Sequence, residues 1–181
     1  GLPMDLPKLV GENVTKIAPI VSSKRAAQLI LKMWAHRYNR TADFIVVEGP
    51  KAGGHLGFSK EQLQDIDKLD YDQEIRDIIE CKKDYEEKFQ RKIPVIVAGG
   101  IFDRKDIEHV MKLGADGVQI ASRFVATEEC DASDAYKQAY IQAEKKNIQI
   151  IQSPVGMPGR ALRNECIKGL ETARKPITKC Y

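Results

Sequence analysis

The sequence lacks several features, and each absence argues against a class of protein. It contains no run of roughly 18 apolar residues, so we expect no membrane span. No low-complexity segment or charge block interrupts it, and 43% hydrophobic with 30% charged residues is ordinary for a globular domain. The excess of 29 basic over 26 acidic residues is small and evenly spread. The composition therefore predicts a folded domain with neither a membrane nor a nucleic acid as its partner.

Cysteine is sparse and unclustered. Cys81, Cys130, Cys166 and Cys180 form no C-x-x-C pair, and no histidine stands at ligand spacing, so we predict no metal site. A chain of 181 residues builds a core without disulfides, and the given sequence shows no signal peptide. We expect a cytoplasmic protein.

Short apolar runs alternate with segments of helical periodicity. We expect strands at 16–21, 44–47, 93–98 and 117–120, and helices from Ser22 or Ser23, over 72–89, after Asp103 and over 133–146. Strands that are apolar on both faces and separated by helices are typical of a parallel sheet. The pattern predicts an α/β fold with four βα units in residues 1–152. Residues 153–181 are expected to form an appendage, a loop as far as Arg160 and a helix from Ala161 to about Ala173.

Glycine-rich and polar residues gather where the predicted strands end, at 48–57, 99–100 and 119–122. Ligands of parallel α/β proteins bind at this edge of the sheet. Gly99 and Gly100 allow close backbone approach to an anion and tolerate positive φ. Ala121 and Ser122 open the next helix with amide N–H groups and a hydroxyl, which also suits an anion. We predict a phosphate site here; a tight turn without a ligand is the alternative.

His55 lies in the segment Ala52-Gly53-Gly54-His55-Leu56-Gly57. Its glycine neighbours leave the imidazole free to project toward a ligand, and histidine is a side chain suited to proton transfer. A surface histidine without a function is the alternative, and the position at a strand end favours the functional interpretation. His36 and His109 lie on predicted helices and are expected to have no such role.

Three segments resemble the nitronate monooxygenase family, formerly called 2-nitropropane dioxygenases. They are Glu48-Gly49-Pro50-Lys51-Ala52-Gly53-Gly54-His55-Leu56-Gly57, Ala98-Gly99-Gly100-Ile101, and residues 113–124, which read LGADGVQIASRF. The flavin-dependent enoyl-acyl carrier protein reductases are close relatives that share most of these signatures.

The resemblance implies a TIM (β/α)8 barrel that binds FMN and carries an extra small domain. It implies that the FMN phosphate is held by Gly99, Gly100, Ala121 and Ser122, and that the rest of the cofactor is lined by Glu48, Gly53, Gln119 and Ile120. His55 matches the family's active-site histidine, to which proton abstraction from the nitroalkane carbon is assigned. Electron transfer to FMN and reaction with oxygen would follow, giving a carbonyl compound and nitrite.

Three positions depart from the family pattern. Glu48 stands where glutamine is frequent, Lys51 stands where an acid is common, and Ala121-Ser122 replaces Gly-Thr. Serine keeps the hydroxyl that phosphate binding needs. An ionised Glu48 would disfavour an anionic reduced flavin unless Lys51 compensates the charge.

The number of βα units predicts that the sequence is part of a larger barrel. A (β/α)8 barrel typically needs about 250 residues, and four units are visible here. We expect the C-terminal half of a larger flavoenzyme, whose partners are its N-terminal half and a small nitronate or nitroalkane substrate. Two alternatives stay open: an NAD(P)H-dependent reductase of an enoyl-acyl carrier protein or a quinone, and a non-catalytic half barrel whose unpaired sheet edges associate, for instance into a homo-oligomer.

Overall fold

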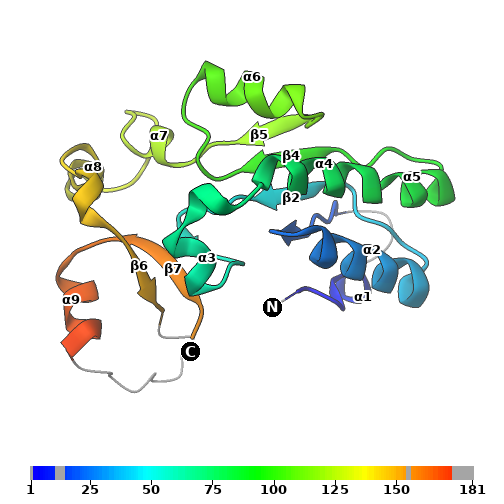
Figure 1. The fold of residues 1–181 in the computed structure, drawn as a ribbon, viewed down its shortest axis with the longest axis horizontal. Coiled ribbons are helices and arrows are strands. Elements are labelled where there is room, and N and C mark those ends of the chain that lie inside the picture. Colours follow the sequence, from blue (N-terminus) through cyan, green and yellow to red (C-terminus); the bar gives the residue numbers. More distant parts are fainter. Residues whose placement is uncertain (1, 11–14, 154–155, 173–181) are drawn as a thin grey trace. The chain divides into compact units, whose positions relative to one another are not determined.

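The computed structural model describes residues 2–10, 15–153 and 156–172, which form two compact units (Figure 1). The first unit comprises Gly1–Lys51 and Asp67–Ile120, and the second comprises Ala52–Ile66 and Ala121–Tyr181. The boundary that we expect after residue 152 concerns a barrel and its appendage, and it stays a prediction.

The first unit is built on a parallel sheet of four strands. These are β1 (Ile20–Val21), β2 (Ile45–Glu48), β4 (Val95–Ala98) and β5 (Gly117–Gln119), and they lie side by side in that order. Every neighbouring pair is parallel, which confirms the α/β prediction of part of a (β/α)8 barrel. The first strand is shorter than expected because Pro19 has no N–H to donate to a ladder, although its carbonyl still accepts from Val46 at 3.0 Å.

Helices connect these strands as the periodicity indicates. The first unit contains α1 (Leu6–Leu9), α2 (Lys24–Tyr38), α4 (Tyr71–Cys81), α5 (Lys83–Phe89) and α6 (Arg104–Lys112). Ser23 caps α2 by accepting from the Ala26 amide, and Asp103 caps α6. Gly114 follows α6 with a φ of 103°, as expected for a glycine that ends a helix. The single helix expected at 72–89 is wrong: it is divided at Lys82 into α4 and α5.

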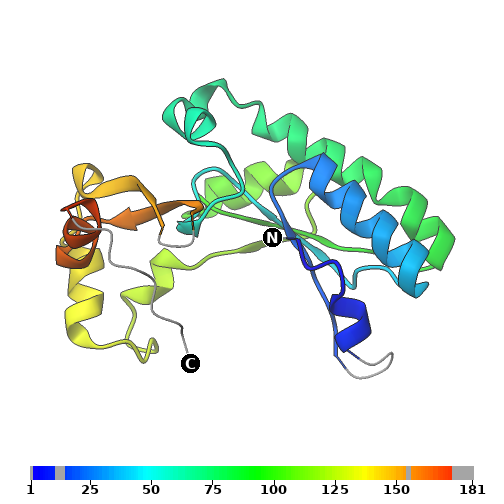
Figure 2. The ribbon, with the colours of Figure 1, turned by 90° about the horizontal axis from the view of Figure 1, so that it is seen from below.

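The core of this unit lies between the sheet and the helices, and α2 and α4 pack side by side (Figure 2). Trp34 and Ile30 of α2 and Ile78 of α4 are fully buried, together with Val47 and Val95 of the sheet. Burial of such a side chain contributes about 1.5–3 kcal/mol, so this cluster holds the strand ends in place.

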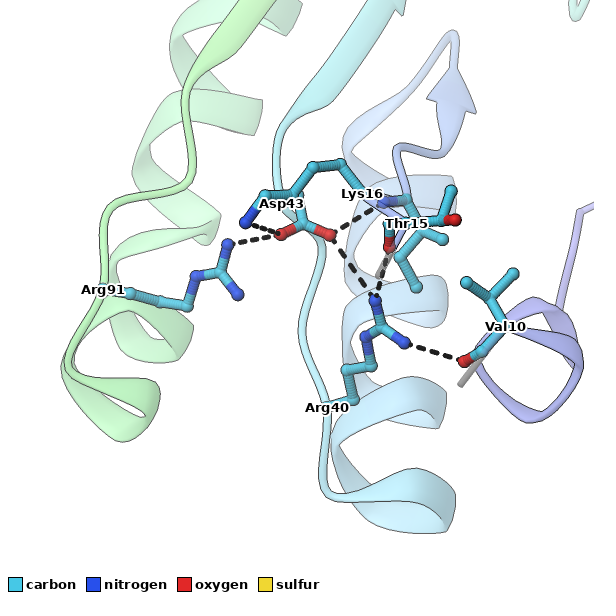
Figure 3. Close-up of polar contacts among 7 residues, drawn as sticks. Val10, Thr15, Lys16, Arg40, Asp43 and Arg91 are labelled. Carbon is cyan, nitrogen blue, oxygen red and sulfur yellow. Dashed lines mark hydrogen bonds and ion pairs between the residues drawn. The ribbon is translucent and has the colours of Figure 1, made fainter. Parts of the chain in front are cut away.

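Charged groups close the opposite end of the sheet, where β2 begins. The Asp43 carboxylate is 5% exposed and lies 2.6 Å from Arg91 Nη2, 3.5 Å from Lys16 Nζ and 3.7 Å from Arg40 Nη2. Figure 3 shows the carboxylate between these three cations, with Arg40 also donating to the carbonyl of Val10. This network is far along the strands from the glycine-rich edge and is structural.

The second unit contains an antiparallel sheet in the order β3 (Gly54–His55), β7 (Pro158–Leu162), β6 (Ile148–Gln152). Its helices are α3 (Lys60–Gln64), α7 (Ser122–Val125), α8 (Asp134–Ile141) and α9 (Glu165–Thr172). Two short 3-10 turns, at Ile66–Lys68 and Lys145–Asn147, complete the regular structure of the described residues. A small buried cluster of Ala52, Leu56 and Leu63, flanked by Phe58 and Ile150, forms the core.

Several expectations for this part of the chain are wrong. Residues 158–160 are not a loop but the start of β7, and Ala161 is in that strand rather than in a helix, which begins at Glu165. The helix expected over 133–146 ends at Ile141, and β6 was not predicted. The Pro158-Gly159 pair reads locally as a turn, whereas pairing with β3 and β6 decides the conformation. The expected helix end at Ala173 lies outside the described residues, as does Cys180.

Candidate functional site

The three predicted clusters follow β2, β4 and β5, at the carboxyl edge of the parallel sheet. Glu48 pairs in register with Ala98, and Ala98 pairs with Gln119, so these three residues form one row across neighbouring strands. The row is followed directly by Gly49 after β2, Gly99 after β4 and Ile120 after β5. The first unit therefore brings together Glu48, Gly99, Gly100, Gln119 and Ile120, as the sequence predicts.

Gly99 and Gly100 have φ angles of 87° and 83°, the positive values that we expected. A Cβ at Gly100 would lie 2.9 Å from Lys51 Cβ, closer than real Cβ atoms approach, so a side chain does not fit there. The Lys51 stem therefore packs directly against Gly100, which has no side chain of its own. Such a turn presents backbone rather than side chain to whatever binds at the edge.

The position of Lys51 adds positive charge near the same turn. Two backbone N–H donors, of Phe102 and Asp103, hold the pKa of the Asp106 carboxyl below its usual range, and the Lys51 charge adds to this effect. Asp106 lies in the first turn of α6. A cation near a glycine turn and a helix N-terminus favours the binding of an anion. Here the Asp106 carboxylate already neutralises part of this positive potential.

Glu48 is the half-buried acid of the row, and burial raises the pKa of its carboxyl. Tyr71, the first residue of α4, lies beside it: its Cε1 atom would be 3.0 Å from a Cβ at Gly49, and its hydroxyl oxygen is buried. Burial, followed by the negative charges of Glu48 and Glu74, raises the pKa of Tyr71. No sequence pattern indicates this tyrosine, because α4 and β2 come together only in the fold.

His55 lies in β3 of the second unit and is exposed, as expected for a histidine between glycines. Its backbone pairs with Gly159 of β7, and the neighbouring Leu56 N–H donates to the Pro158 carbonyl at 2.9 Å. Arg160 Nη1 donates to the Ala52 carbonyl at 2.9 Å. Sequence reasoning missed this arginine because it treated the segment as an appended loop.

The remaining candidates, Gly53, Ala121 and Ser122, are also exposed and belong to the second unit. Ser122 begins α7 and Ala121 immediately precedes it, which confirms the expected helix start. The predicted residues therefore divide into two sets, one in each unit. Their roles toward a ligand stay predictions.

Within the described part of the chain, the other titratable groups form no second site. His109, for which no role in proton transfer is expected, pairs with Asp72 at 2.9 Å and joins α6 to α4. Among the described residues, no cluster of histidine, cysteine or acidic side chains has the arrangement of a metal site. No helix of the same residues has the length and apolarity needed to cross a membrane.

Comparison with known proteins identifies the family. The sequence profile described as nitronate monooxygenase matches residues 8–181. A probable nitronate monooxygenase of Staphylococcus saprophyticus is 32% identical over 125 residues, which are 69% of this chain and 33% of that protein. A Mycobacterium tuberculosis protein, (3aS,4S,5R,7aS)-5-hydroxy-7a-methyl-1-oxo-octahydro-1H-indene-4-carboxyl-CoA dehydrogenase, is 31% identical over 134 residues, 74% of this chain and 33% of its own length.

Among solved structures, FabK from Thermotoga maritima aligns with a TM-score of 0.69 and 27% identity, covering 95% of this chain and 47% of FabK. The chain thus spans about a third of the length of these two curated relatives and about half of this structure. The profile match extends over nearly all of the chain and includes each of the three glycine-rich clusters. The chain belongs to the nitronate monooxygenase family, a family of oxidoreductases.

Proposed function

We propose that this chain is part of an FMN-dependent oxidoreductase that oxidises alkyl nitronates with oxygen to a carbonyl compound and nitrite. The proposal rests on His55, which is exposed in a glycine-rich segment on β3 and which, by the resemblance of that segment, corresponds to the family's active-site histidine. The glycine turn and the polar row at the carboxyl edge of the parallel sheet are compatible with this chemistry.

The residues at the edge of the parallel sheet fit an FMN phosphate and ring. The Gly99-Gly100 turn has two successive positive φ angles, which suits an oxyanion bound by backbone N–H groups, and the Lys51 stem packs against Gly100. Ser122, with its hydroxyl at the start of α7, and the adjacent Ala121 would complete the phosphate contacts. The rest of the cofactor would lie against Glu48, Gly53, Gln119 and Ile120. When bound, FMN supplies the two-electron acceptor.

His55 would act as the general base toward a neutral nitroalkane. An imidazole nitrogen takes the proton from the carbon next to the nitro group, and the electron pair of the C–H bond moves into the nitro group to give the nitronate. A preformed nitronate needs no such step. His55 is exposed and its chain neighbours are Gly54 and the buried Leu56, so substrate access is not blocked locally.

A second candidate function is a reductase that uses NAD(P)H on an enoyl-acyl carrier protein or a quinone. One observation favours it: a relative at 31% identity is named as a dehydrogenase of a carboxyl-CoA, which is a thioester. Glu48 also favours it, since a half-buried acid with a raised pKa is a candidate proton donor to a reduced substrate. FMN and His55 serve both reactions.

Turnover separates these functions. The purified protein is first examined by its visible absorbance spectrum and by identification of any released flavin. Oxygen uptake with a nitronate in the absence of NAD(P)H supports the monooxygenase, whereas NAD(P)H-dependent loss of an enoyl thioester or quinone, without nitronate turnover, supports the reductase. A colourless protein that forms dimers and turns over neither substrate would overturn both and favour the non-catalytic half barrel.

The proposed setting is the cytoplasm, with a small-molecule substrate and the remaining βα units of the barrel as partners. Measurement of the molecular mass in solution determines whether the protein forms a homo-oligomer. None of these proposals requires a nucleic acid or a membrane.

A further inference from the structure

We propose that Arg160 is a positioning residue for His55: its guanidinium fixes the glycine-rich loop 52–56 against β7, so that the imidazole is held in one place. The inference rests on the proposed role of His55 as the base. It assigns a function to the segment 158–160, which neither the family signatures nor the sequence pattern singled out.

The loop that carries His55 has few side chains that could fix its conformation. Gly53 and Gly54 have nothing within 4 Å of the positions that a Cβ would occupy, and both are exposed. Glycine loses more conformational freedom on ordering than any other residue, so such a loop is mobile unless other segments hold it. The position of the imidazole therefore depends on contacts made by the loop backbone.

Strand β7 provides these contacts at consecutive residues. Pro158 accepts from the Leu56 N–H at 2.9 Å, and Gly159 pairs with His55. A Cβ at Gly159 would lie 3.2 Å from the Gly54 carbonyl oxygen, so the two strands approach as closely as they do because residue 159 is glycine. The antiparallel pairing thus fixes the carboxyl-terminal half of the loop.

Arg160 fixes the other half. Its backbone pairs with Gly54, and its Nη1 donates to the carbonyl of Ala52 at 2.9 Å, across 108 residues of sequence. Ala52 is 7% exposed, so its carbonyl needs a partner within the protein. A hydrogen bond from a charged guanidinium is roughly twice as strong as a neutral one.

The burial of the Arg160 guanidinium indicates that its hydrogen bond to Ala52 is part of the folded structure and not an incidental surface contact. Arg160 is half-buried on β7, and burial lowers the pKa of its guanidinium while leaving it charged at neutral pH. Burial of a charge is costly unless it is hydrogen-bonded, and the Ala52 carbonyl is one of its acceptors. Loss of the positive donor would therefore release the loop at Ala52 and weaken the two-residue β3–β7 pairing that holds Leu56, while β6 and β7 remain paired.

The test uses three variants of the purified holoenzyme. Arg160→Gln removes the charge, Arg160→Lys keeps a charged donor, and Arg163→Gln is the control. Arg163 is an exposed arginine in the same unit whose backbone N–H donates to the Asn147 carbonyl at 2.8 Å, a contact that side-chain substitution keeps.

The first readout is amide hydrogen exchange, which does not depend on activity. In Arg160→Gln we expect the Leu56 amide to exchange about ten- to a hundredfold faster, the effect of losing one hydrogen bond to a charged group. The Arg163 amide reports whether the hairpin of β6 and β7 stays folded and is expected to keep its protection. Arg160→Lys should restore part of the protection at Leu56, and Arg163→Gln should leave it unchanged.

The second readout is kinetic. We expect kcat on a neutral nitroalkane to fall about tenfold or more in Arg160→Gln, with KM and the rate on a preformed nitronate little changed, because only proton abstraction needs the imidazole in place. Arg160→Lys should recover part of the rate. Equal losses on both substrates, or no recovery with lysine, would overturn the positioning role.

The two readouts distinguish failure of this inference from failure of the proposed function. Unchanged exchange at Leu56 in Arg160→Gln overturns the inference, whatever His55 does. Faster exchange at Leu56, in an enzyme whose His55→Ala variant keeps its nitroalkane rate, leaves the loop contact intact and overturns the base role instead.

Discussion

The Asp43 carboxylate accepts a hydrogen bond from the Ile17 N–H at 2.7 Å, while the Asp43 N–H donates to the Ile17 carbonyl at 2.9 Å. The same double contact recurs two strands further along, where Asp116 and Val95 exchange both bonds at 2.8 Å. Each aspartate precedes a strand and follows a buried alanine. The repeated Ala-Asp pair therefore sets where each strand begins relative to the preceding one.

We expect Asp43→Asn to lower the free energy of unfolding by about 2 kcal/mol at neutral pH, because a hydrogen bond to a charged group contributes about 1.5–3 kcal/mol. Burial would raise the pKa of Asp43, but the Ile17 N–H and the Arg91 guanidinium outweigh it and hold the pKa below its usual value. The stabilisation is therefore complete above the unfolded pKa of about 3.9 and is lost as the pH falls through the folded value. Urea unfolding across this range measures it.

Asp116→Asn is the matched control, because Asp116 accepts the same kind of backbone hydrogen bond but lacks the three cations that surround Asp43. Asp116 is exposed and has no ion pair within the described ranges 2–10, 15–153 and 156–172. We expect a smaller loss of stability than at Asp43. Equal losses at the two positions, independent of pH, would show that the cations around Asp43 contribute nothing.

Gly100→Ala is expected to destabilise the first unit by about 1–3 kcal/mol and to weaken FMN binding. The φ of 83° disfavours any other residue, and the new Cβ would meet Lys51 Cβ at 2.9 Å. Gly156→Ala is the control, because Gly156 has a φ of 88° but nothing within 4 Å. Thermal unfolding with and without FMN measures both effects. A loss no larger than at Gly156, with full FMN affinity, would contradict close packing at this turn.

The features that the sequence predicted are those with a local cause. The apolar runs of β2 and β4, the cap at Asp103 and the glycine after α6 each follow from a few adjacent residues. The glycine clusters also fell at strand ends as expected. Hence the carboxyl edge, with Glu48, Gly99, Gly100 and Gln119, was predictable without the fold.

The features that were missed depend on partners distant in sequence. Pro158 and Gly159 favour a turn by themselves, and only their pairing with β3 and β6 makes them a strand. The Arg160 contact with Ala52 and the approach of Tyr71 to Glu48 are likewise set by packing. Periodicity carries no information about such pairs, and one arginine in a glycine-rich segment gives no signal of its role.

Glu48→Gln is expected to stabilise the first unit at neutral pH. Burial raises the folded pKa of Glu48 above its unfolded value, so the wild-type protein loses stability as the pH rises through the interval between them. Below the unfolded pKa the two proteins should be equally stable. Unfolding by urea at several pH values measures the difference.

Glu61→Gln is the opposite-sign control for Glu48. Its own backbone N–H and the Ser59 hydroxyl hold the pKa of this exposed carboxyl below its usual range, so the glutamine should not stabilise at neutral pH. In the holoenzyme, Glu48→Gln should also raise the flavin reduction potential, since an ionised Glu48 opposes an anionic reduced flavin. Potentials that agree within error would remove the basis for placing Glu48 beside the ring.

His55→Ala is expected to reduce turnover of neutral nitroalkanes by about 10²–10⁴-fold, the usual contribution of a general base. Preformed nitronates need no deprotonation at carbon, so their oxidation should fall far less. Oxygen uptake on both forms of the same nitroalkane measures the ratio, and His36→Ala, at an exposed position on α2, is the control that should change neither rate. A comparable loss on both substrates would mean that His55 contributes to binding or to later steps rather than to proton abstraction. The ratio of the two rates, rather than either rate alone, therefore decides the role of His55.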